Sequence, residues 1–71
     1  MTKKQNEKMT KLMVYVAREI KEATRYLDEN KDELEKPVRE FWLGERDAFK
    51  KVLGQLTLTY IEMLEEGVDN D

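Results

Sequence analysis

A single proline, Pro37, most constrains what this chain can fold into, because it divides two long segments whose apolar residues have helical spacing. Proline lacks the backbone N–H that a helix interior needs, yet its fixed φ angle suits the first turn of a new helix. It also disfavours helical geometry at the preceding residue, Lys36. The chain is therefore expected to form one helix before Pro37 and another after it.

The segment before Pro37 has apolar residues at intervals of three, four and seven residues, which is the periodicity of an α-helix. The residues are Met9, Leu12, Val16, Ile20, Ala23, Leu27 and Leu34. Good helix formers follow Leu27, so the pattern predicts a first helix at about residues 8–35 and a turn near residues 36–37.

The segment after Pro37 repeats this spacing and predicts a second helix at about residues 38–66. Its apolar positions are Val38, Trp42, Phe49, Leu53, Leu56, Tyr60 and either Met63 or Leu64. Gly67 is a natural C-terminal stop. Within the helix, Gly44 is a candidate for a bend and Gly54 for the close approach of a neighbouring backbone, since glycine otherwise only weakens a helix.

The position of the turn has a second interpretation. Asp28 or Asn30 can cap a helix that starts within residues 28–31 and then kinks at Pro37. The sequence leaves both interpretations open, because residues that cap helices and residues that extend them are mixed in this region.

The length of 71 residues corresponds to one small domain, residues 1–71, and a short connection makes two helices antiparallel neighbours. We therefore predict an all-α fold, an antiparallel two-helix hairpin. Burial of its 28 apolar residues barely offsets the conformational entropy that the chain loses on folding. The hairpin is therefore expected to dimerise into a four-helix bundle.

The sequence contains neither Cys nor His, which removes thiol nucleophiles, imidazole bases, disulfides and nearly every zinc site. It has no phosphate-binding glycine loop or calcium loop, and two helices provide no cleft for paired carboxylates. We therefore expect no enzymatic activity, catalytic residue, cofactor, metal ion or small-molecule substrate. No apolar run reaches the ~18 residues of a membrane span, so a cytoplasmic location without membrane contact is expected.

Charge is distributed unevenly along the chain. Residues 1–25 carry seven Lys or Arg and three Asp or Glu, whereas residues 41–71, with an acidic tail at 67–71, carry three and seven. Antiparallel packing brings these ends together. Lysines near the start can contact phosphates, which makes a nucleic-acid-binding regulator the alternative function. These lysines are Lys3, Lys4, Lys8 and Lys11.

At the end of the hairpin where the termini meet, the apolar surface of the two helices is larger than one neighbouring helix can cover. Leu58 and Ile61 lie off the main apolar row of the second helix, and Met13 and Val14 lie beside that of the first. Contiguous exposed apolar patches mark association sites, and Met adapts to many partners. These four residues are the predicted binding surface for a protein partner.

The string "FWLGERDAFKKVLGQL", residues 41–56, resembles a segment of small early-region proteins of phages of Gram-positive bacteria. The matching residues are Trp42, Gly44, Asp47, Ala48, Val52 and Leu53. The resemblance implies a phage or prophage origin in a bacterial host. It also implies a role as a regulator or inhibitor that binds and modulates a host or phage protein.

The two-helix plan with an acidic tail is also similar to the plasmid-encoded Rop hairpin, a dimeric four-helix bundle that binds paired RNA loops. No residue-by-residue correspondence exists on the RNA-binding face, so this resemblance concerns only the bundle plan. Self-association and a protein partner are the predicted interactions, and nucleic acid is the alternative partner.

Overall fold

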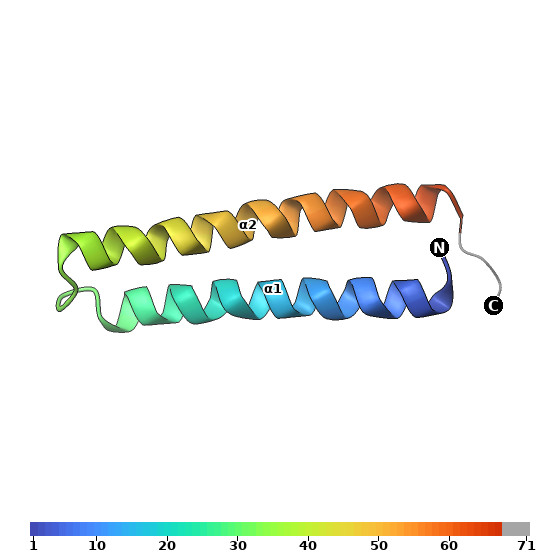
Figure 1. Ribbon diagram of the computed structural model, residues 1–71. Helices are drawn as coiled ribbons and strands as arrows, with labels where there is room; N and C mark the ends of the chain where they lie inside the picture. Colours follow the sequence, from blue (N-terminus) through green and yellow to red (C-terminus); the bar gives the residue numbers. More distant parts are fainter. Residues whose placement is uncertain (68–71) are drawn as a thin grey trace.

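Two antiparallel α-helices make up the structure. The computed structural model describes residues 1–67, in which α1 spans Lys3–Glu29 and α2 spans Lys36–Glu65. The helices lie side by side with a short turn between them, and residues 1 and 67 are both at the end opposite that turn (Figure 1). The predicted all-α hairpin is confirmed.

Contacts at both ends of the hairpin fix its register. At the open end, the amino group of Met1 donates a hydrogen bond to the carbonyl oxygen of Gly67 at 2.8 Å. Near the turn, the rings of Tyr26 and Trp42 pack against each other with their centroids 4.5 Å apart and their planes tilted by 34°. The residue numbers of each pair add up to 68, so the two helices keep one register from end to end.

The helix–helix interface has a regular spacing on both helices. With the exception of four partly buried residues (Glu19, Leu43, Thr57 and Thr59), the buried and partly buried residues of both helices recur at alternating intervals of three and four, the average period of 3.5 that is typical of coiled coils. On α1 these residues are Asn6, Met9, Met13, Val16, Ile20, Ala23 and Leu27, and on α2 they are Trp42, Arg46, Phe49, Leu53, Leu56, Tyr60 and Met63. Within residues 1–67 only Val16 and Ala23 are fully buried.

Helix α1 begins at Lys3, several residues before the predicted start, because a capping box precedes it. The Thr2 hydroxyl accepts a hydrogen bond from the Gln5 backbone N–H at 3.1 Å, and the Gln5 side chain accepts one from the Thr2 N–H at 2.9 Å. These bonds satisfy two of the donors that a helix start leaves free. The lysine-rich start of the chain is therefore helical.

Helix α1 ends at Glu29, so the predicted end at residue 35 is wrong. The backbone N–H and the side-chain amide of Asn30 both donate to the carbonyl oxygen of Tyr26, at 3.1 and 2.9 Å. Asparagine competes with helix propagation through such local bonds. The second interpretation placed the turn near the observed one, but it expected a new helix there, whereas Asn30 caps the end of α1.

Helix α2 begins at Lys36 with Pro37 in its first turn, as the sequence predicts. It continues without interruption through Gly44 and Gly54, and no atom would lie within 4 Å of a Cβ added at either glycine. The predicted close approach of a backbone at Gly54 is therefore wrong within this hairpin. At the other end, Gly67 adopts a φ of 94°, which confirms the predicted C-terminal stop.

Three residues of the predicted apolar rows lie outside the helix–helix interface: Leu12, Val38 and Leu34, the last of which lies in the turn between α1 and α2. Leu12 is 45% exposed and Met13 takes the interface position instead, while Val38 is also exposed. The sequence left open whether Met63 or Leu64 is the last residue of the apolar row of α2. Met63 lies in the interface, and Leu64 is exposed. A 3.5-residue period explains Met13, because its neighbours in the interface lie four residues before it and three after it.

We predict that Val16→Ala lowers the free energy of unfolding by about 2 kcal/mol, because it removes buried methyl groups and leaves a cavity. Val14→Ala is a matched control with the same chemical change two residues away. Val14 is 43% exposed and Val16 only 3%, so the control should change stability by less than about 0.5 kcal/mol. Urea unfolding followed by circular dichroism measures both values, and equal losses would contradict the observed interface.

Candidate interaction surfaces

One groove lies along the half of the hairpin nearest the termini, between α1 and α2. It has a volume of about 490 Å³ and an almost entirely apolar lining. The lining residues are Thr10, Met13, Val14, Ala17, Leu53, Thr57 and Tyr60. We call this groove the terminal groove. The Tyr60 hydroxyl, which is partly buried, donates to the side-chain oxygen of Asn6 and is therefore satisfied inside the hairpin.

The terminal groove contains two of the four residues predicted to bind a protein partner. Met13 and Val14 line it, and Ile61 is exposed immediately after the lining residue Tyr60. Leu58 is 56% exposed but lies about 160° around α2 from Tyr60, at 100° per residue, and so faces away from α1. The structure therefore brings Met13 and Val14 together with Ile61 nearby, and it separates Leu58 from them.

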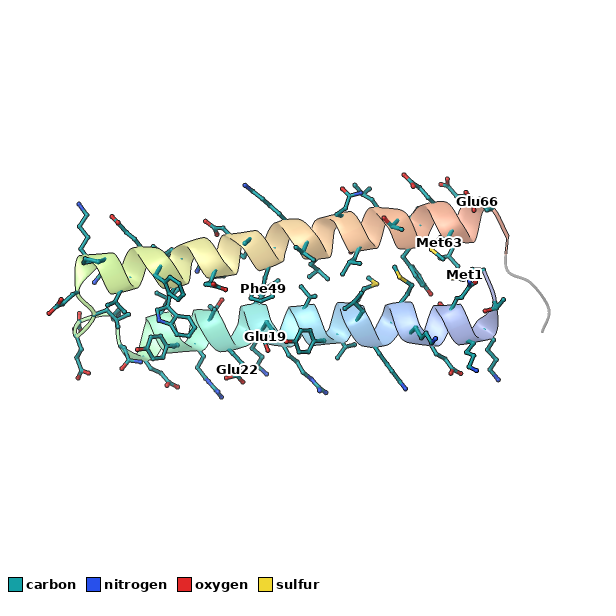
Figure 2. All side chains as sticks on the ribbon, viewed as in Figure 1. Met1, Glu19, Glu22, Phe49, Met63 and Glu66 are labelled. Carbon is teal, nitrogen blue, oxygen red and sulfur yellow. The ribbon has the colours of Figure 1, made fainter. Side chains whose placement is uncertain are left out.

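A second groove lies nearer the turn, on the other side of the helix–helix interface. Its volume is about 710 Å³, and its lining combines three carboxylates and three aromatic rings with one guanidinium group, that of Arg18. The carboxylates belong to Glu19, Glu22 and Glu45, and the rings to Phe41, Trp42 and Phe49. Figure 2 shows Phe49 pointing from α2 toward α1, where Glu19 lies. We call this groove the acidic groove.

The aromatic end of the acidic groove is held by ring contacts. Trp42 is partly buried, with Tyr26 packed against it at a centroid distance of 4.5 Å and Phe41 packed edge-on at 6.0 Å. Such pairs contribute about 0.5–1.5 kcal/mol beyond their burial. Phe41 itself remains mostly exposed. The predicted core role of Trp42 beside the turn fits this position, although α1 supplies the covering ring and solvent still reaches the indole.

The four predicted nucleic-acid-binding lysines are all exposed on α1. Lys4, Lys8 and Lys11 follow at intervals of four and three and so share one side of the helix, whereas Lys3 projects from another side. Arg18, seven residues after Lys11, extends the same side toward the acidic groove.

Ion pairs do not join the basic and acidic ends of the chain within residues 1–67. The pairs in this part are Glu22 with Arg25 at 2.8 Å and Arg46 with Asp47 at 3.8 Å. Residues 68–71 of the predicted acidic tail lie outside the described residues. The two ends of the described chain are close together as predicted, but the lysines there form no described salt bridge.

The acidic groove was missed by sequence reasoning. Its residues come from two helices at positions 18–23 and 41–49, and no spacing rule links such positions before the register is known. The sequence contains one signal of the acidic groove. Glu19, Glu22 and Tyr26 are spaced by three and four residues, which places them on one side of α1.

Residues 1–67 contain no group of three or more carboxylates placed to hold a metal ion, and none of the described helices is long and apolar enough to cross a membrane. Comparisons with protein-family models, with curated proteins and with solved structures each found no match. The surfaces themselves are therefore the basis for a functional proposal.

We predict that Tyr26→Ala shifts the fluorescence of Trp42 to longer wavelength, because removal of the adjacent ring admits water to the indole. The chain has one tryptophan, so the signal is unambiguous. Leu58→Ala, on the far side of α2, is the control and should leave the emission maximum unchanged. An unchanged maximum in Tyr26→Ala would contradict the described aromatic contact.

Proposed function

We propose that this chain is a non-enzymatic interaction protein that binds another protein through the terminal groove. The observation that carries the proposal is the open apolar lining, in which Met13 and Val14 face Leu53 and Thr57 across the groove. A grooved apolar surface with a small number of polar groups is what the centre of a protein interface requires.

The shape of the terminal groove supports a helical ligand. Small side chains, Thr10 and Ala17 on α1 and Thr57 on α2, line it beside larger ones. Small residues let a third helix come close, and Met13 can adjust its rotamer to the ligand. An amphipathic helix that presents apolar residues at intervals of three and four fits such a groove.

Regulation of a host or phage protein in the bacterial cytoplasm is the biological role that we propose. The support is the resemblance of residues 41–56 to small early-region phage proteins, which share no single activity but among which a role of this kind is to be expected. On this proposal the chain acts as an inhibitor or regulator by occupying a surface of its partner, and it needs neither a cofactor nor a metal ion.

We predict that Val14→Asp abolishes capture of a specific protein from a lysate of the source organism. A charge placed in the apolar groove must lose its hydration when the partner docks, which is strongly unfavourable. Leu58→Asp is the matched control, since Leu58 lies on the opposite side of α2, and it should retain the partner. Capture at high salt after nuclease treatment, followed by mass spectrometry, gives the comparison. Equal capture by both variants would reject the groove as the binding site.

A second candidate function is nucleic-acid binding through α1. The observation that favours it is the shared side of Lys4, Lys8 and Lys11, with the exposed ring of Tyr15 four residues further on. Basic groups near an exposed aromatic ring can contact phosphates while the ring stacks on a base.

For this second candidate, we predict that affinity for a mixed-sequence single-stranded RNA falls roughly 20-fold between 50 and 200 mM salt, since three phosphate contacts release about two counterions. Lys8→Ala should reduce that salt dependence by about one unit of slope. Lys51→Ala, on the far side of α2, is the control. Fluorescence anisotropy with labelled RNA measures both slopes, and an absence of binding at low salt would exclude this function.

A further inference from the structure

The side of α1 that borders the acidic groove has lysines before its midpoint and glutamates after it, with Arg18 beside the glutamates. Tyr15, at that midpoint, is 58% exposed. Lys8 lies seven residues before it and Glu22 seven residues after it, so the three share one side of the helix within about 20° per heptad. Lys11 and Glu19 stand four residues before and after it. We call this side the charged face.

An antiparallel copy of the charged face is complementary to the original. Two α1 helices that cross at Tyr15 in opposite directions place position 8 of one opposite position 22 of the other, each about 10 Å from the crossing point. In the same way, Lys11 of one copy lies opposite Glu19 of the other, each about 6 Å from the crossing point. Each pair of opposite charges therefore occurs twice in the dimer, with the roles of the two copies exchanged, as a two-fold axis requires.

We infer that two copies of this chain associate through their charged faces, with α1 antiparallel to α1 around Tyr15 and with Lys8 and Lys11 of each copy at the acidic groove of the other. This inference rests on the self-association that the sequence leads us to expect and gives it a specific interface. The acidic groove keeps an excess of negative charge when the positive charge of Arg18 is counted, so the lysines of the second copy approach a surplus of carboxylates, from Glu19, Glu22 and Glu45.

Apolar burial supports the same pairing. Leu12, Tyr15 and Tyr26 are exposed on the charged face, and Phe41 and Val52 are exposed on α2. The chain has an accessible surface of 5717 Å², whereas a compact monomer of 8.5 kDa has about 4,650 Å². The excess of about 1,000 Å² is comparable to the ~800 Å² that each partner buries in a standard interface.

The internal ion pair of Glu22 does not oppose the association. Its bond to Arg25 at 2.8 Å joins side chains that are 61% and 57% exposed, and such surface pairs contribute little to stability. Glu22 can therefore leave Arg25 and pair with a lysine of the second copy at a small cost in free energy. The less hydrated environment at an interface strengthens the new ion pair.

The terminal groove stays open in this arrangement. Ala17 lines the terminal groove and Glu19 the acidic groove, and two residues correspond to a rotation of about 200° around α1. The two grooves therefore face different directions. A dimer formed through the charged faces presents two terminal grooves outward, so dimerisation and partner binding can be tested separately.

Charge reversal with complementation tests the interface. One variant carries Lys8→Glu and Lys11→Glu, and the other carries Glu19→Lys and Glu22→Lys. Each should weaken its own dimer roughly 100-fold or more, since like charges then meet at both ends of the interface. An equimolar mixture should restore the dimer, because every reversed position of one variant faces a reversed position of the other.

Sedimentation equilibrium at tens of micromolar gives the masses, and circular dichroism verifies that each variant remains helical. We expect a dimer for the wild type and for the mixture, and a monomer of 8.5 kDa for each variant alone. The control variant Lys50→Glu with Lys51→Glu, on α2, should remain dimeric. A monomeric wild type, a dimeric single variant or a monomeric mixture would each overturn the inference, whatever the terminal groove binds.

A cross-linking experiment gives an answer even where a charge-reversed variant loses its helices. The chain has no cysteine, so Tyr15→Cys introduces one thiol on the proposed two-fold axis. Two such thiols lie close enough for a disulfide, and oxidation should yield a covalent dimer quickly. Leu58→Cys, on the opposite side of α2, should yield it much more slowly. Equal rates would contradict the arrangement.

Discussion

Each helix of this hairpin has a single neighbouring helix, and this constraint governs the rest of the structure. A helix that packs against one partner buries a narrow row of residues and leaves most of its circumference in water. Val16 and Ala23 are accordingly the only fully buried residues among residues 1–67, and ten large apolar side chains there remain exposed. We therefore propose that a second copy covering an open face stabilises the fold.

The two open faces differ in chemistry because of the register that the end contacts impose. With Met1 at Gly67 and Tyr26 on Trp42, the small and apolar residues near the termini form the terminal groove. The same register places carboxylates of α1 and α2 together beside aromatic rings in the acidic groove. On the proposals above, the terminal groove takes an apolar helix of a partner and the acidic groove takes basic residues of a second copy.

The sequence predicted the hairpin because Pro37 and the helical spacing are local features that tertiary contacts did not override. It could not distinguish Leu12 from Met13, since three and four residues after Met9 are equally compatible with a helix. It placed the end of α1 too late because Asn30 acts through bonds to Tyr26 that only the formed helix provides. The acidic groove could not be predicted, because its composition depends on the register of two distant segments.

The concentration dependence of thermal unfolding tests most directly the claim that a second copy stabilises this hairpin. If the folded state is a dimer, mass action requires the midpoint of unfolding to rise with protein concentration. We predict a steady rise in the midpoint, followed by circular dichroism, from low micromolar to millimolar concentration at low salt. A midpoint that is independent of concentration, with cooperative unfolding, would mean that α1 and α2 alone suffice and would contradict the account.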